Sequence, residues 1–150
     1  MTKNFALCAA IMLALTGIAQ TGAARAEGLD PIAIRQVGMD LQAGTFGFIR
    51  TVVAAKGDVK PLEAPAKALA RWAATIPSVY PAGSDKGGNT KALPEIWSDR
   101  AGFEKIAVSM GEAATKLAAA AKAGDADEVA IETKAVGDQC GACHRGYRAK

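Results

Sequence analysis

Cys140-Gly141-Ala142-Cys143-His144 lies near the C-terminus of this chain of 150 residues. The pattern C-x-x-C-H is the attachment signature of c-type haem, in which two thiols add across the haem vinyl groups and the adjacent imidazole becomes an axial iron ligand. On a helix, Cys140 and Cys143 share a face because they are three residues apart, and His144 follows on the same side. The motif therefore predicts one covalently bound haem c with its iron, attached to a helix.

Other interpretations of the motif are a zinc site, a thiol redox pair and a simple disulfide. A structural zinc site needs four ligands, and the remaining cysteine of the chain, Cys8, is far away in the sequence. A thioredoxin-like pair is expected beside a βαβ pattern, and the sequence has no strand signal. A helical bundle with a structural C-x-x-C is the non-haem alternative, and absence of a pyridine haemochrome signal would favour it.

The length indicates one folded domain, and the net charge of +3 is spread without a basic stripe. This charge distribution does not indicate a nucleic-acid-binding surface. The acidic residues are scattered along helix faces, without a paired-carboxylate constellation, and the sequence contains no catalytic triad or phosphate loop. We therefore do not expect an enzyme.

Residues 1–26 have the features of a cleaved secretory signal peptide. Lys3 gives the positive start, residues 5–18 form an apolar run that is too short to span a membrane, and Ala24-Arg25-Ala26 is an A-x-A-like cleavage site. Cys8 would leave with the leader. We expect residues 27–150 to be a mature protein in the bacterial periplasm, with no membrane attachment after cleavage.

Four helical patterns fill the mature chain. The first begins at Asp30-Pro31 and runs to about Lys56-Gly57, and the second begins after Asp58 or nearer Ala64 and stops at Pro77. The third covers roughly residues 94 or 98 to 123, and the fourth begins with a capping box at Asp125. An irregular connection, residues 78–94, joins the second and third patterns.

Each pattern carries apolar residues at the 3,4 spacing of packed helices. The predicted core stripes are Ile34, Val37, Leu41, Gly44 and Phe48; Leu62, Ala66, Leu69, Ala73 and Ile76; Phe103, Ile106, Met110, Ala113, Leu117 and Ala120; and Val129, Thr133, Val136, Cys140, Cys143 and Tyr147. Together they predict an all-α protein, an antiparallel four-helix bundle with the haem between its helices.

The chain has one histidine, so His144 cannot be joined by a second histidine ligand within one subunit. The mature chain keeps two methionines, Met39 and Met110. The sixth position of the iron is therefore methionine, lysine, an exogenous ligand or empty. Arg35 lies one helical turn before Met39 and is a candidate for pairing with a haem propionate; the alternative is a solvated arginine and a methionine that fills the core.

The mature chain resembles the class II c-type cytochromes, and within them cytochrome c′. The residues that carry the resemblance are Arg35-Gln36 with Met39, the loop 81–84, residues 90–97 with Asp99 and Phe103, Gly124-Asp125, and the terminal Cys140-x-x-Cys143-His144-x-x-Tyr147-Arg148-x-Lys150. In class I cytochromes c the C-x-x-C-H motif is near the N-terminus instead.

The resemblance implies roles for particular residues. Cys140 and Cys143 would hold the haem, His144 would be the proximal iron ligand, and Met39 would lie on the distal side as a possible sixth ligand. The resemblance also implies that Arg35 and Gln36 lie near the propionates, that Arg148 lies beside the proximal histidine, and that Asn89 and Thr90 approach the haem edge.

The function implied is electron transfer by a monohaem cytochrome, with a five-coordinate iron that binds small gases such as NO and CO. One alternative is a low-spin carrier in which Met39 and His144 both ligate the iron. Another is an NO-binding or scavenging protein. Periplasmic redox partners are expected, and the resemblance implies that a homodimer can form through the first two helices.

Overall fold

The computed structural model describes residues 30–150, whose regular structure is helical. The long helices are α1 (Pro31–Ala54), α2 (Glu63–Thr75), α4 (Arg100–Ala123) and α5 (Ala126–Tyr147). The short helices are η1 (Lys60–Leu62), η2 (Ile76–Val79) and α3 (Glu95–Ser98). The predicted signal peptide, residues 1–26 with Cys8, lies outside the described residues.

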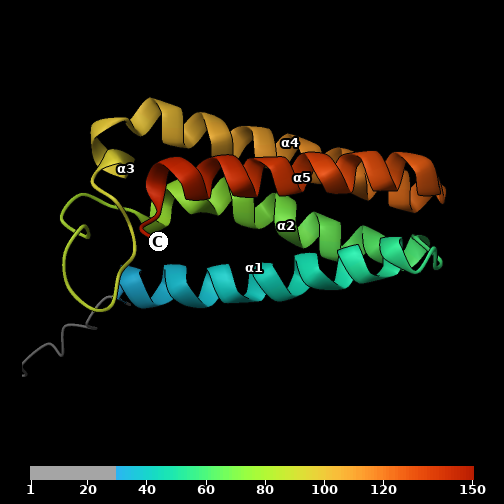
Figure 1. Ribbon diagram of the computed structural model, residues 1–150, viewed down its shortest axis with the longest axis horizontal. Coiled ribbons are helices and arrows are strands. Elements are labelled where there is room, and N and C mark those ends of the chain that lie inside the picture. The colour runs from blue at the N-terminus through green and yellow to red at the C-terminus, as the bar shows by residue number, and fades with distance from the viewer. Residues whose placement is uncertain (1–29) are drawn as a thin grey trace, which may run out of the picture.

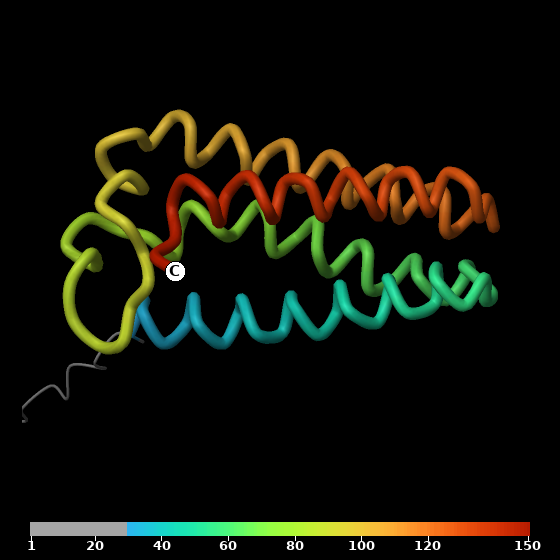
Figure 2. Tube along the Cα trace, viewed as in Figure 1, coloured from blue at the N-terminus to red at the C-terminus, as the bar shows by residue number. Residues whose placement is uncertain are grey.

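The long helices lie side by side along the longest axis of the molecule (Figure 1). The connection between η2 and α3 covers the same end of the bundle as the C-terminus, as the tube view also shows (Figure 2). The predicted four-helix bundle is therefore confirmed. Within residues 30–150, no helix is both long and apolar enough to cross a membrane.

Local sequence signals set most of the helix ends. The carboxylate of Asp30 accepts a hydrogen bond from the backbone N–H of Ile32 at 2.9 Å, and that of Asp125 accepts one from Glu128 at 3.0 Å. Gly124 ends α4 in the left-handed conformation with φ 79°. Because Pro61 lies in the preceding 3-10 turn, α2 begins at Glu63, which agrees with the later of the two predicted starts.

The predicted stripes of the second, third and fourth patterns face the core. Every member of the second stripe is buried, and so are all members of the third except the half-buried Ile106. In the fourth stripe Cys140 and Cys143 are half-buried and the others are buried. The periodicity of these helices therefore predicted their inward faces correctly.

The stripe predicted for the first helix was wrong except at Ile34, which is half-buried against the core. Val37, Leu41 and Phe48 are 58%, 68% and 52% exposed. The inward face of α1 instead follows the 3,4 spacing of Ile32, Arg35, Met39, Gln42, Phe46, Ile49 and Val53, whose members are buried or half-buried. Because Arg35 and Gln42 are polar, the apolar residues of α1 did not reveal this face.

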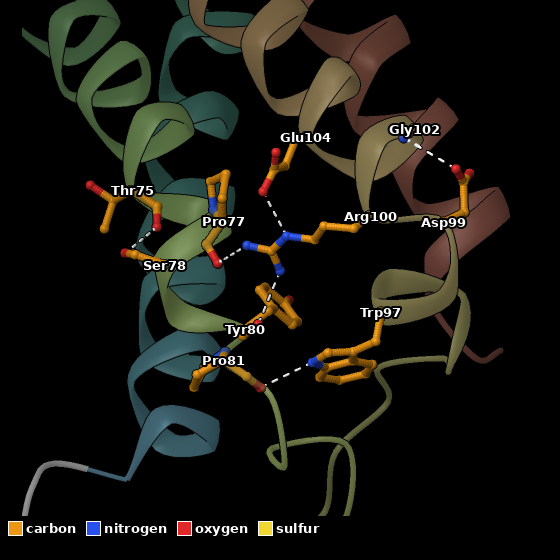
Figure 3. A network of polar contacts seen from close by, with 10 residues as sticks. All are labelled: Thr75, Pro77, Ser78, Tyr80, Pro81, Trp97, Asp99, Arg100, Gly102 and Glu104. Atoms are coloured by element: carbon orange, nitrogen blue, oxygen red, sulfur yellow. Dashed lines mark hydrogen bonds and ion pairs between the residues drawn. The ribbon is translucent and has the colours of Figure 1, made fainter.

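The connection between η2 and α3 is held in place by side chains of the following helices (Figure 3). The guanidinium of Arg100 donates to the backbone oxygens of Pro77 at 2.6 Å and Tyr80 at 3.0 Å, and it also pairs with Glu104. The indole N–H of Trp97 donates to the backbone oxygen of Pro81 at 3.0 Å. These bonds give partners to backbone carbonyls in and just after η2. The irregular connection between η2 and α3 therefore keeps a fixed path over the end of the bundle.

Candidate functional site

Met39, Cys140, Cys143 and His144 line one cavity between α1 and α5. Met39 comes from the inward face of α1, and the other three come from the last turns of α5. The rest of the lining is Gln42, Ile76, Phe103, Ile106, Ala107, Met110 and Gln139. The structure thus brings the predicted attachment motif and the predicted distal residue together, and it also places Met110 in the same wall.

The two cysteines have the environment of buried, protonated thiols. Both are free of disulfides and half-buried against the core. Burial raises the pKa of Cys140, and burial together with the neighbouring Cys140 raises the pKa of Cys143 to about 11. Both thiols therefore stay neutral near pH 7, one helical turn apart.

His144 lies at the edge of the cavity, with an exposed side chain. Burial of the ring and then the charge of Arg148 lower its pKa below the usual value. A neutral imidazole is the form that ligates a metal ion. The Arg148 side chain is exposed and lies close enough for its charge to act on His144.

Arg35 is one turn before Met39 and is only 3% exposed. Its guanidinium donates to Ser84 Oγ at 3.0 Å, to the Ser84 carbonyl at 2.8 Å and to Thr90 Oγ1 at 2.7 Å, and it lies 4.7 Å from the centre of the Tyr80 ring. Burial lowers the pKa of Arg35. All three acceptors are neutral, and none of the ion pairs found among residues 30–150 includes Arg35.

The predicted haem-edge residues are brought together in pairs. Arg35 contacts Thr90, and the amide of Gln36 donates to the backbone oxygen of Asn89 at 3.0 Å. The chain after Thr90 then meets the end of α5. The N–H of Leu93 donates to the Tyr147 carbonyl at 3.1 Å, and that of Ala149 donates to the Lys91 carbonyl at 2.8 Å.

The sequence reasoning missed Gln42 and Trp72. Gln42 lines the cavity beside Met39, and its amide N–H approaches Cys140 Sγ at 3.9 Å. The Trp72 indole covers Gly38, where a Cβ atom would lie 1.9 Å from a ring carbon. The 3,4 spacing from Arg35 through Met39 to Gln42 was the signal for Gln42. Gly38, beside the distal Met39, was the only signal for Trp72.

Gly44 and Gly47 make no close contact with another helix of the same chain. A Cβ atom built at either position meets no side chain or neighbouring backbone within 4 Å. Both glycines lie on the exposed side of α1, away from the inward stripe.

The residue types around this small cavity, of about 20 Å³, suit a covalently attached haem by their chemistry. The lining supplies two neutral thiols, a neutral imidazole on α5, and Met39 across the cavity on α1. Arg35 is buried and makes no salt bridge among residues 30–150, so it suits an anionic group such as a propionate nearby. Within residues 30–150, no cluster of three or more His, Cys, Asp or Glu side chains offers a metal site of the zinc type.

Comparison with known proteins gives consistent matches. The family model described as "Cytochrome C'" matches residues 30–148. Cytochrome c′ of Alcaligenes xylosoxydans xylosoxydans is 34% identical over 123 residues, which cover 81% of this chain and 94% of the relative.

Two solved structures are similar in sequence and in fold. A nitric oxide complex of a mutant of cytochrome c prime from Alcaligenes xylosoxidans has a TM-score of 0.73 and 35% identity, covering 81% of this chain and 94% of that one. A cytochrome c′ described as having an unusual ligand-controlled dimer dissociation has a TM-score of 0.74 and 31% identity, covering 80% and 95%.

Proposed function

This chain belongs to the cytochrome c′ family, which binds covalent haem c, and from that premise we propose that it is a periplasmic electron-transfer protein with an open iron site for small gases. The observation that carries the proposal is the cavity shared by Met39, Cys140, Cys143 and His144. Haem c supplies a one-electron iron couple and an axial position that can bind a small ligand.

Each residue has a defined task in this proposal. Cys140 and Cys143 would hold the haem covalently through their sulfur atoms, and His144 would supply a neutral imidazole to the iron. Met39, on α1, would limit access to the iron. Arg35, Gln36, Asn89, Thr90 and Arg148 would contact the haem edge or lie beside the histidine.

Absorption spectra of the ferric and ferrous protein test this function. We expect a covalent haem, recognised by pyridine haemochrome and by haem staining on a denaturing gel, and a high-spin ferric spectrum. Replacing both Cys140 and Cys143 with alanine should abolish the stain, whereas replacing His144 with alanine should preserve it and change the spectrum. A wild-type protein without covalent haem would reject the proposal.

The position of Met39 also supports a second candidate, a low-spin electron carrier with Met39 and His144 as axial ligands. Met39 and His144 line the same cavity from opposite helices. A thioether ligand raises the reduction potential and closes the iron to gases. In that case the ferric spectrum is low-spin with a sulfur-to-iron charge-transfer band, and Met39→Ala converts it to high-spin.

NO binding can be the main role, with electron transfer secondary. The support is that a relative forms a nitric oxide complex. Titration of the ferrous protein with NO and CO, followed optically, measures this capacity. Deletion of the gene should then sensitise cells to nitrosative stress, whereas unchanged resistance would leave electron transfer as the function.

A homodimer through α1 and α2 fits the exposed apolar side chains of α1. Val37 and Leu41 border an apolar groove of about 530 Å³ whose other wall includes Leu69 and Trp72 of α2. Burying such a surface between two copies removes apolar area from water. Sedimentation of the wild type and of Leu41→Asp, with and without a gaseous ligand, tests this assembly.

The proposal also includes export of the protein to the periplasm. Residues 1–26 have the sequence of a signal peptide, and relatives of the chain are bacterial. Fractionation of the native host should place the haem-bearing protein in the periplasm. The N-terminus of the mature protein should then be Glu27, as read by mass spectrometry.

A further inference from the structure

A groove between α1 and α5 lies beyond the attachment motif and has no part in the proposed function. Its volume is about 880 Å³, its wall on α1 runs from Phe46 to Ala54, and its wall on α5 runs from Ala130 to Cys140. Phe46 is seven residues after Met39, a distance of about 10 Å along a helix. This α1–α5 groove therefore extends from the cavity of the motif toward the other end of the bundle.

The walls of the α1–α5 groove combine small residues with one aromatic ring. Gly47 and Ala54 line the groove on α1, and Ala130 and Gly137 line it on α5. The half-buried Phe46 reaches from α1 to α5, because a Cβ atom at Gly137 would lie 3.3 Å from its ring. Aromatic rings pack well against other flat apolar groups, in offset or edge-to-face geometry. The groove thus offers apolar surface to a flat molecule.

Charged side chains line the same groove. Arg50 is one helical turn after Phe46 on the same face of α1; its side chain is exposed, and it takes part in none of the ion pairs found within residues 30–150. On α5, Lys134 pairs with Asp138 at 2.7 Å, so these two charges offset each other. The remaining positive charge of the lining is that of Arg50, whose guanidinium can bind one carboxylate through two parallel hydrogen bonds.

Thr133, in the wall on α5, has a hydroxyl without a partner. It is only 7% exposed, and its Oγ1 atom makes no hydrogen bond to any group of residues 30–150. In other helical threonines the hydroxyl donates to the carbonyl four residues earlier at 2.8 to 3.0 Å, as in Thr45, Thr51, Thr75 and Thr115. A buried hydroxyl without a partner is unfavourable, and an acceptor in the groove, met by rotation about χ1, would relieve this cost.

We propose that the α1–α5 groove binds a small aromatic carboxylate, whose ring packs against Phe46 and whose carboxylate pairs with Arg50. The Thr133 hydroxyl donates a further hydrogen bond to that carboxylate. Apolar walls with a few polar groups in a cavity of this size are typical of sites for small organic molecules. An inorganic anion would leave the apolar walls unused, and a neutral hydrocarbon would leave the guanidinium unused.

The first test compares three probes on the haem-loaded wild type by isothermal titration calorimetry and saturation-transfer NMR. The probes are 2-naphthoate, its neutral analogue 2-naphthalenemethanol, and acetate. We expect one site per chain for 2-naphthoate, with binding of the alcohol and of acetate weaker by about tenfold or more. Equal affinity for the alcohol, equal affinity for acetate, or no saturation transfer to 2-naphthoate would each overturn the inference.

Variants then assign the binding to particular side chains. Arg50→Gln should weaken 2-naphthoate about tenfold or more and leave the alcohol unchanged, because only the carboxylate loses its partner. Thr133→Val keeps the shape of the side chain and should weaken 2-naphthoate about threefold or more. The matched control is Arg71→Gln, which removes an exposed arginine of α2 outside the groove and should bind as the wild type does.

Ala130→Trp is a variant that fills the groove, and it should abolish binding of 2-naphthoate. Because Ala130 is exposed, this substitution leaves the core of the bundle intact, as thermal unfolding should verify. Binding that survives both Ala130→Trp and Arg50→Gln would place 2-naphthoate elsewhere and overturn the inference.

The ferric absorption spectrum, recorded during the same titration, separates the groove from the iron. An unchanged spectrum supports binding in the groove, whereas a spectral change with the same midpoint places the carboxylate on the iron and overturns the inference. A wild-type protein without covalent haem would reject the proposed function, but the comparison of Arg50→Gln with Arg71→Gln would still decide the fate of the groove.

Discussion

The hydroxyl of Tyr147 donates a 2.6 Å hydrogen bond to the carboxylate of Asp99, and so joins the last residue of α5 to the N-cap residue of α4. Asp99 also accepts from the backbone N–H of Gly102 at 3.2 Å. Since Tyr147 is three residues after His144, this bond fixes the end of the helix that carries the attachment motif. The position of the histidine therefore depends on a contact outside the cavity.

This bond gives a prediction for alkaline pH. The hydrogen bond to Asp99, with burial, raises the pKa of Tyr147 to about 12 from its usual value of 10. The folded protein thus holds the phenol proton where the unfolded chain releases it, so stability falls as pH rises from about 10 to 12. Urea unfolding at several pH values should show this fall, and Tyr147→Phe should reduce it. An identical pH dependence in the variant would contradict the assignment.

Arg35 should be important for stability as well as for the site. Arg35→Met removes three hydrogen bonds to Ser84 and Thr90 and should destabilise the fold by about 2 kcal/mol or more, because these bonds involve a buried cation. The neighbouring control is Gln36→Ala. That side chain is exposed, so we expect a loss below about 0.5 kcal/mol. Denaturant unfolding of both proteins gives the comparison, and equal losses would argue against a special role of Arg35.

The contact between Gly38 and Trp72 predicts that Gly38→Ala is harmful. Its Cβ would lie 1.9 Å from the indole ring, so the indole or its helix must shift, at a cost of about 1 to 3 kcal/mol. In Gly44→Ala, within the same helix, the new methyl group meets no side chain within 4 Å. That variant should be more stable by about 0.5 to 1 kcal/mol, because alanine favours the helix. Thermal unfolding distinguishes the two, and matching shifts would refute the close contact.

The N-cap of α5 offers a prediction independent of the cavity. Asp125→Ala removes the acceptor for the N–H of Glu128 and should cost about 1 kcal/mol. Asp125→Ser retains an acceptor of similar capping strength and should lose much less. Urea unfolding of the alanine and serine variants measures both losses of stability. If the serine and alanine variants are equally unstable, the side-chain cap is not the cause.

Most of the fold followed from local sequence patterns. The stripes of α2, α4 and α5 have small or apolar residues at almost every inward position, and Asp30, Gly124 and Asp125 mark helix ends by their own chemistry. The attachment motif also places its cysteines on the inward face of α5. These features depend on neighbours in the sequence, which is why periodicity and capping rules predict them.

The inward face of α1 could not be predicted in this way. Arg35 and Gln42 occupy inward positions because of partners that are distant in the sequence: Ser84 and Thr90 for the first, and the cavity beside Cys140 for the second. A polar residue on a helix is ordinarily assigned to solvent, so the exposed Val37 and Leu41 were mistaken for core. The part of the site formed by Gln42 was therefore visible only after the helices had been placed in space.

The cavity is bounded by the first and the last long helix, and this arrangement has a consequence for the order of assembly. Contacts between distant parts of a chain form late, because they close the longest loops. The helices α2, α4 and α5 follow one another and pack together, so they can assemble with both thiols in place before α1 docks. In that order of assembly both thiols would face the space that α1 fills and would be open to solvent until α1 docks.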